Sequence, residues 1–126
     1  MLKDSKAYSG FSVPDLAAAK KFYREILGVD LKDSGPGFVL LIPGTNGVLV
    51  YPKKDHVPAT YTMLNFPVAD IDEAVDELAS RGVVFERYEG MTDEKGIARG
   101  IATNRGPDIA WFKDPAGNIL SVLNEG

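Results

Sequence analysis

Residues 11–16, Phe-Ser-Val-Pro-Asp-Leu, recur 55 positions later as residues 66–71, Phe-Pro-Val-Ala-Asp-Ile. The segment that follows each copy ends in Gly-Val, first at Gly28 and again at Gly82. Repetition of this kind indicates that one supersecondary unit has been used twice. We therefore interpret the chain as a single domain, residues 1–126, built from two modules of the same design.

The two modules, about 1–57 and about 58–126, each predict a strand that leads into a helix capped by an aspartate. Asp15 and Asp70 occupy the N-cap position before apolar residues at helical spacing. Glu73 completes an acidic variant of the capping box at the second helix. We expect helices over about 15–27 and about 70–81.

Short runs of β-type residues follow each predicted helix, and turns rich in Pro, Gly and Asn separate the last two runs of each module. The predicted strands are 29–31, 38–42 and 48–51 in the first module and 83–88, 109–112 and 119–123 in the second. With the strand that opens each module, they predict an α+β fold of two βαβββ modules.

Residues 89–106 break the symmetry between the modules. This segment has 18 residues and contains four glycines, whereas the first module uses only residues 32–37 at the equivalent connection. Long loops in small domains tend to carry function. Apolar Met91, Ile97 and Ile101 favour a lid that packs onto something, and a mobile surface loop is the alternative.

Composition excludes several classes of function. The chain is 44% apolar and 25% charged, which is typical of a folded globular domain. Its formal charge is −4 and its basic residues are scattered, so we expect no nucleic-acid partner. There is no apolar run of membrane-spanning length and the first residues are too polar for a signal peptide. We expect a cytoplasmic protein without a membrane partner.

The reactive residue types are few. The sequence has no Cys and one His, and it has neither a G-x-S-x-G elbow nor a phosphate-binding glycine loop. The single histidine, His56, lies in a polar segment between the modules. We interpret it as a solvated linker residue, because no partner that would orient it is evident. The alternative is a general acid or base.

Two signatures carry a resemblance to a known family. Val13–Gly28 and the stretch Phe112–Asn118, Phe-Lys-Asp-Pro-Ala-Gly-Asn, together with the paired modules, resemble the vicinal oxygen chelate (VOC) superfamily. That superfamily includes glyoxalase I, bleomycin-resistance proteins and extradiol dioxygenases. The resemblance implies that the strands of both modules form a half-open cup around a small-molecule ligand and that the protein is a homodimer. It does not identify a reaction, because function resides in the site.

The resemblance also predicts where metal-dependent relatives would hold a divalent ion. These positions fall at Tyr8, Met63, Ser121, and Val50 or a neighbour. The four strands concerned contain no His, Cys, Asp or Glu, whereas zinc, iron and nickel require such donors. We therefore expect no bound metal and no cofactor. A metal-dependent enzyme would need a site shared between subunits.

A set of candidate ligand-binding residues follows from strand alternation and from the resemblance. In the first strands, Phe11, Val13, Leu64, Phe66 and Val68 are expected to pack under the helices, so that the intervening side chains face the cup. The candidates are Tyr8, Ser12, Met63, Asn65, Arg99, Trp111 and Ser121.

Several of these candidates have a second interpretation. Tyr8, Asn65 and Ser121 could be satisfied interior polar groups, and Trp111 could be a core residue instead of a ligand-stacking one. Whether Trp111 or its neighbour Phe112 points inward is left open. Arg99 and Arg105 could pair with an anionic ligand or with nearby acidic residues.

We therefore expect a metal-independent protein that binds a small, largely apolar or aromatic molecule, as sequestering resistance proteins do. The alternative is an enzyme. It would be a glyoxalase-like lyase or isomerase or a dioxygenase with a shared metal site, or a metal-free acid/base catalyst using Tyr8, Glu94 or His56. A third interpretation is an interaction module whose cup is filled by its own side chains. The sequence does not decide whether there is catalysis.

Overall fold

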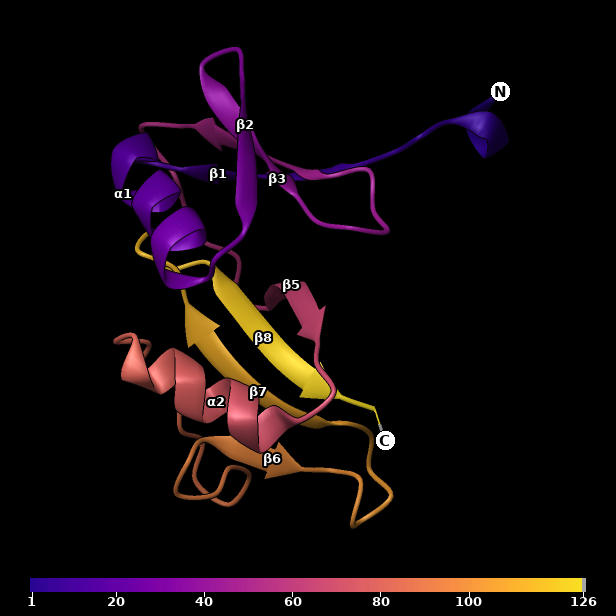
Figure 1. Cartoon of the computed structure of the whole chain (residues 1–126), viewed down its shortest axis with the longest axis vertical. Coiled ribbons are helices and arrows are strands. Elements are labelled where there is room, and N and C mark those ends of the chain that lie inside the picture. Colours follow the sequence, from indigo (N-terminus) through magenta and orange to yellow (C-terminus); the bar gives the residue numbers. More distant parts are fainter. Residues whose placement is uncertain (126) are drawn as a thin grey trace. The chain divides into compact units, whose positions relative to one another are not determined.

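The computed structural model describes residues 1–125 and separates the chain into two compact units, with the boundary between Val57 and Pro58. Each unit contains one four-stranded mixed sheet and one main helical segment (Figure 1). The α+β fold predicted from the sequence is therefore confirmed.

The first unit has a short 3₁₀ turn, one helical segment and four strands. In chain order these are η1 (Leu2–Asp4), β1 (Ser9–Val13), α1 (Leu16–Lys21), η2 (Phe22–Ile26), β2 (Asp30–Ser34), β3 (Gly37–Leu41) and β4 (Val48–Pro52). The strand order in the sheet is β1-β4-β3-β2. β1 runs parallel to β4, and the other neighbours are antiparallel.

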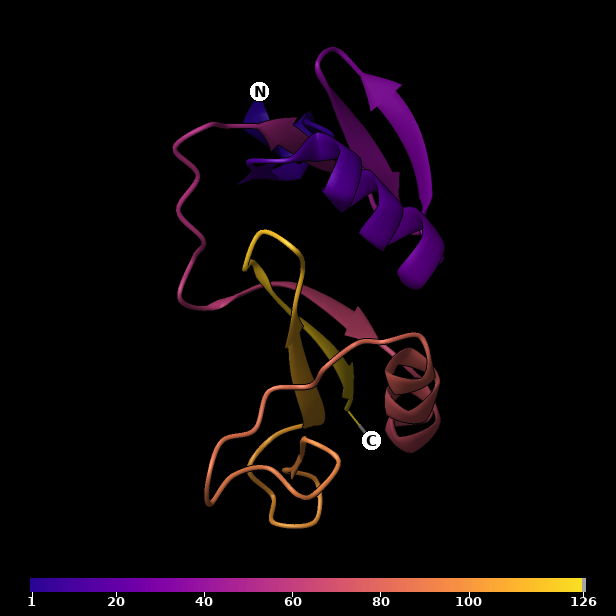
Figure 2. The same cartoon turned by 90° about the vertical axis from the view of Figure 1, so that its left-hand side faces the viewer.

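The second unit repeats this arrangement. Its elements are β5 (Thr62–Pro67), α2 (Ile71–Ser80), β6 (Ile97–Arg99), β7 (Asp108–Lys113) and β8 (Ile119–Asn124). The strand order is β5-β8-β7-β6, again with one parallel pair, β5 with β8. Figures 1 and 2 show α2 against one face of this sheet, where it packs on β7 and β8.

Both helices begin where the aspartates predict. The Asp15 carboxylate accepts a hydrogen bond from the Ala18 amide, and the Asp70 carboxylate accepts one from the Glu73 amide, each at 3.1 Å. Each side chain thus satisfies an otherwise unpaired amide of the first turn. The first helix ends in a π turn, η2, closed by the bond from Leu27 N to Phe22 O at 3.0 Å.

Strand alternation builds the core of each unit. In the first unit Val13 is fully buried, and the ring of Phe11 lies 5.8 Å from that of Tyr23. In the second unit Phe112 is 1% exposed and its ring meets Phe85 edge-on at 5.6 Å. Each sheet therefore buries one face against its own helix, which directs the intervening side chains to the opposite face.

The predicted strand over 83–88 is wrong as a continuous strand. Val83 and Phe85 are buried and Val84 is exposed, so the alternation in the sequence is real. The backbone, however, pairs with β7 only through an isolated bridge from Phe85 to Phe112 and the bond from Glu86 N to Trp111 O. The chain then loops away and returns to the same edge of β7 as β6.

Much of segment 89–106 is therefore ordered by the sheet and by local hydrogen bonds. Ile97 pairs with Ala110 and is fully buried. The Asp93 carboxylate accepts hydrogen bonds from the amides of Lys95 and Ile97, each at 2.9 Å, and forms a turn before β6. The action of this segment as a lid stays a prediction. None of the helices in residues 1–125 has the length and apolar character that crossing a bilayer requires.

Candidate functional site

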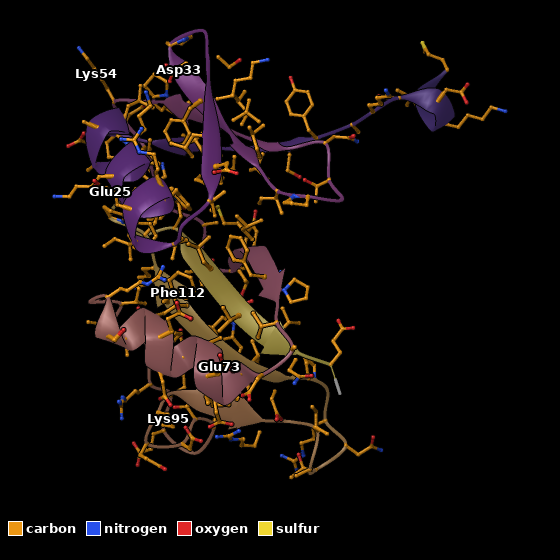
Figure 3. The ribbon with its side chains drawn as sticks, in the orientation of Figure 1. Glu25, Asp33, Lys54, Glu73, Lys95 and Phe112 are labelled. Carbon is orange, nitrogen blue, oxygen red and sulfur yellow. The ribbon has the colours of Figure 1, made fainter. Side chains whose placement is uncertain are left out.

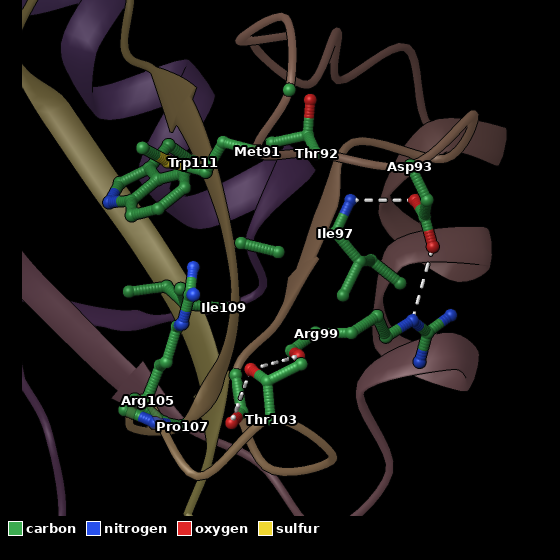
Figure 4. A pocket seen from close by; sticks show the side chains of 13 residues that line it. Met91, Thr92, Asp93, Ile97, Arg99, Thr103, Arg105, Pro107, Ile109 and Trp111 are labelled. Carbon is green, nitrogen blue, oxygen red and sulfur yellow. Dashed lines mark hydrogen bonds and ion pairs between the residues drawn. The ribbon is translucent and has the colours of Figure 1, made fainter.

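The second unit contains a hollow beside the edge of its sheet. Residues 90–93 of the preceding loop and residues 97–100, which comprise β6 and the residue after it, line it together with Thr103, Arg105, Pro107, Ile109 and Trp111. Its volume is about 790 Å³, which lies within the range of small-molecule sites. We call it the Trp111 hollow. Figure 4 shows Met91, Ile109 and Trp111 on one side of it and Asp93 and Arg99 on the other.

Trp111 is the largest aromatic side chain that lines the hollow. In β7 it alternates with buried Phe112, so its indole projects from the sheet face opposite α2. Phe112, and not Trp111, therefore lies under the helix. The indole N–H donates to the Thr62 hydroxyl at 3.0 Å, and Tyr88 meets the ring edge-on at 5.6 Å. With its polar atom already satisfied and its ring half-buried, Trp111 offers an oriented aromatic surface.

Asn65 and Ser121 share a row of the sheet with Trp111. Ser121 pairs with Asn65 on one side and with Trp111 on the other. The Ser121 hydroxyl is fully buried and donates to the side-chain oxygen Oδ1 of Asn65 at 2.6 Å. The structure thus brings three of the candidate residues together, but the side chains of Asn65 and Ser121 are bonded to each other, and of these two only Ser121 is an interior polar group.

Arg99 lines the hollow, but its guanidinium belongs to a charge network with α2. It donates to both carboxylate oxygens of Asp72, at 2.9 and 2.8 Å, and to Asp93 at 3.1 Å. Lys95 also pairs with Asp72 and with Asp76, at 3.0 and 2.9 Å. Figure 3 shows Lys95 beside α2. The network fastens β6 and the segment before it to α2, so the Arg99 guanidinium is already paired within the protein.

The pKa values of the network follow from these bonds. Hydrogen bonds from Arg99, and then from Lys95, hold the pKa of Asp72 far below its usual range. Asp72 in turn raises the pKa of Arg99. Burial acts to raise the pKa of Asp93, but the amides of Ile97 and Lys95 and the guanidinium of Arg99 outweigh it and lower the value. All three groups are therefore charged at neutral pH.

His56 has a hydrogen-bond partner, which corrects its interpretation as a solvated linker residue. Its Nδ1 lies 2.6 Å from the Ser12 hydroxyl, and the ring is half-buried. The bonds from Lys53 N to Val13 O and from His56 N to Lys53 O turn the chain back over the end of β1. The sequence could not show this contact, because the two residues are 44 positions apart.

Two other candidates lie at strand ends. Tyr8 directly precedes β1 and is 64% exposed. Met63 lies in β5 at an irregularity of the ladder between Thr62 and Leu64. Tyr8 and Ser12 belong to the first unit, whereas the Trp111 hollow is formed by the second.

The positions at which metal-dependent relatives would hold an ion carry weak donor groups in this chain. In the first sheet Leu49 pairs with Gly10, and in the second sheet Ser121 pairs with Asn65. Gly10 and Asn65 are equivalent positions of the two modules, so Leu49 is the neighbour of Val50 that corresponds to Ser121. Phenol, thioether, hydroxyl and alkyl groups at these positions do not fit a divalent transition metal. Among residues 1–125, no three His, Asp or Glu side chains come together as a metal site.

Several residues that line the hollow were not among the predicted ligand-binding residues, chiefly Met91, Ala98, Arg105 and Ile109. Ile109 could have been found, because it lies two positions before Trp111 in one strand and so shares its face. Ala98 could not have been found from the sequence, because β6 was not predicted. Its pairing with Ile109 depends on where the chain returns to the sheet.

The sequence and the fold identify the superfamily of the chain. The sequence profile of the Glyoxalase/Bleomycin resistance protein/Dioxygenase superfamily matches residues 7–122, and the chain belongs to this superfamily. No curated protein matches the sequence. The cup that the resemblance implies stays a prediction.

Solved structures with the same fold cover nearly the whole chain. A superfamily member from Sphaerobacter thermophilus is 24% identical, with a TM-score of 0.71 and coverage of 99% of this chain and 100% of that one. TnmS3, an antibiotic binding protein from Streptomyces, is 23% identical, with a TM-score of 0.68 and 98% coverage of both chains. FosX, a fosfomycin resistance protein from Listeria monocytogenes, is 16% identical, with a TM-score of 0.68 and coverage of 95% and 92%.

Proposed function

We propose that this protein binds a small, largely apolar or aromatic molecule in the Trp111 hollow and needs no metal ion to do so. The observation that carries the proposal is the half-buried indole of Trp111, whose N–H is already bonded to Thr62. Such a ring loses little freedom when an aromatic ligand stacks on it, and stacking adds about 0.5–1.5 kcal/mol to the burial of apolar area.

The rest of the hollow supports a ligand of this kind. Met91 is 57% exposed and gives a flexible apolar wall, while Ile109 and Ala98 add apolar surface from β7 and β6. An antibiotic binding protein and a fosfomycin resistance protein share the fold of this chain. Sequestration of a small molecule is therefore the function that we propose, and the absence of metal donors is consistent with it.

The single tryptophan provides a direct test. Protein labelled with 5-fluorotryptophan gives one ¹⁹F resonance, which reports on Trp111 alone. We expect neutral naphthalene-2-carboxamide to shift this resonance in a saturable manner. No shift up to millimolar probe would contradict the proposal.

Matched variants locate the binding. Met91→Ala removes an exposed side chain that lines the hollow and is expected to weaken binding about threefold or more, on the basis of the apolar area lost. Tyr61→Leu is the control, because Tyr61 is also largely exposed in the same unit, at 69%, but does not line the hollow. Equal weakening by both variants would place the ligand elsewhere.

A second candidate function rests on the bond between Ser12 and His56. A serine hydroxyl bonded to an imidazole is an arrangement that could serve metal-free acid/base catalysis. His56→Ala separates the candidates, since it abolishes turnover of a His-dependent enzyme and leaves binding in the Trp111 hollow unchanged.

The assembly is a separate proposal. A homodimer is implied by the family resemblance, and native mass spectrometry of freshly purified protein tests it. The same spectrum reports any bound metal and any retained small molecule. A monomer at micromolar concentration would contradict the proposed dimer.

A further inference from the structure

The Trp111 hollow contains a charged group that the protein itself leaves unused. Three charged side chains line it: Asp93, Arg99 and Arg105. Asp93 and Arg99 pair with each other, and Arg99 is also held by both oxygens of Asp72. Arg105 has no ion pair and no side-chain hydrogen bond to any other residue within 1–125.

The uncharged polar side chains of the hollow also have partners. The Thr92 hydroxyl accepts from the Tyr88 amide at 2.9 Å and lies 3.3 Å from the Tyr88 carbonyl oxygen. The Thr103 hydroxyl is directed at the Gly100 carbonyl oxygen at 3.3 Å. The guanidinium of Arg105 is therefore the strongest hydrogen-bond donor of the hollow that remains open to a ligand.

The position of Arg105 places this donor beside the apolar surface. In the view of Figure 4 its side chain points toward the ring of Trp111, and both residues line the hollow together with Ile109. A flat apolar molecule on the indole would thus have one end close to the guanidinium. Arginine binds a carboxylate through two parallel hydrogen bonds, which favours a planar acid over a neutral group of equal size.

We propose that the ligand of the Trp111 hollow is an aromatic or other flat apolar molecule with one carboxylate, and that Arg105 binds this carboxylate. The inference rests on the proposed function and adds the chemical class of the ligand. The net charge of −4 disfavours general attraction of anions, so a preference for an acid must come from a local cation.

The experiment compares naphthalene-2-carboxylate with naphthalene-2-carboxamide by calorimetry and by the ¹⁹F resonance of labelled Trp111. The two probes share one ring system and differ in charge. Because Arg105 is exposed, we expect the acid to bind about three- to tenfold more tightly at low salt. The preference should shrink between 50 and 500 mM NaCl, because salt screens exposed charges, whereas binding of the amide should not weaken.

Two variants of equal charge assign the effect. Arg105→Gln should abolish the preference for the acid and leave the affinity for the amide unchanged. Arg81→Gln, which removes the same charge from the end of α2, should retain the preference. Loss of the preference in both variants, or its survival in Arg105→Gln, would overturn the assignment to Arg105.

The remaining outcomes separate the two proposals. Equal binding of acid and amide by the unmodified protein would overturn the inference of an acidic ligand while leaving the proposed function intact. Failure of both probes to bind at millimolar concentration would contradict the proposed function and the inference together.

Discussion

The hydroxyl of Ser12 lies 2.6 Å from Nδ1 of His56, although 44 positions separate the two residues in the sequence. A hydrogen bond of this length fixes the orientation of the only imidazole in the chain. It also connects the last part of β1 to the segment that follows β4. This contact gives the histidine a structural role whether or not it has a chemical one.

A double-mutant cycle tests the strength of this contact. Ser12→Ala and His56→Ala should each lower the free energy of unfolding, and the pair should show a coupling of about 0.5–1.5 kcal/mol, the usual net value of one hydrogen bond. The cycle cancels the other interactions of each residue. Urea unfolding monitored by circular dichroism measures all four proteins, and strictly additive effects would contradict the hydrogen bond.

The charge network around Asp72 predicts acid-dependent stability. Because Arg99 and Lys95 lower the pKa of Asp72 in the folded protein below its ordinary value of 3.8, the unfolded chain takes up this proton first. The stabilising contribution is fully present above about pH 4 to 5 and is lost as the pH falls toward the folded-state pKa.

Thermal unfolding at pH 7 and pH 3 measures this effect. The Asp72→Asn variant should lose less stability than the unmodified protein between the two pH values. Glu94→Gln is the control, since Glu94 is exposed and is not part of the network described above. An identical loss in the unmodified protein and Asp72→Asn would show that the network contributes nothing.

The turn between β7 and β8 depends on a buried carboxylate. Asp114 is 5% exposed, and it accepts hydrogen bonds from the Ala116 and Asn118 amides at 2.9 Å and from the Asn118 side chain at 3.0 Å. Asp114→Ala should destabilise the protein by about 2 kcal/mol or more, because buried donors lose their acceptor. Asp30→Ala, at an exposed position, should change stability by less than about 0.5 kcal/mol.

Chelation tests the independence from metal. After dialysis against EDTA, the affinity for naphthalene-2-carboxamide should change less than twofold. The positions at which metal-dependent relatives would hold an ion supply no suitable metal ligands in this chain. Equilibrium dialysis against zinc, nickel and iron should show no stoichiometric ion. One ion per subunit that is required for binding would overturn this part of the account.

The sequence predicted the fold wherever a local signal determines structure. Asp15 and Asp70 mark the starts of both helices because a carboxylate caps the first turn without help from distant residues. The interruption after Phe85 was not predicted, because an isolated bridge and a full strand share the same alternation of buried and exposed residues.

The candidate site was predicted less completely, because it depends on pairing over long distances in the sequence. Trp111 was identified from its type, and the ladder then decided its face. The sequence analysis chose Arg99 and not Arg105 as a candidate ligand-binding residue, although it weighed the same alternative partners for both. Only the structure shows that Arg99 is hydrogen-bonded to Asp72, 27 positions away, while the guanidinium of Arg105 stays available to a ligand in the hollow.

Chemical-shift mapping of the ¹⁵N-labelled full chain tests binding in the Trp111 hollow most directly. With saturating naphthalene-2-carboxylate, the largest changes should fall on the amides of residues 90–93 and 97–100 and of Ile109 and Trp111. Amides of β1 to β4 should change far less. Changes centred on Ser12 and His56, or no changes at all, would contradict the account.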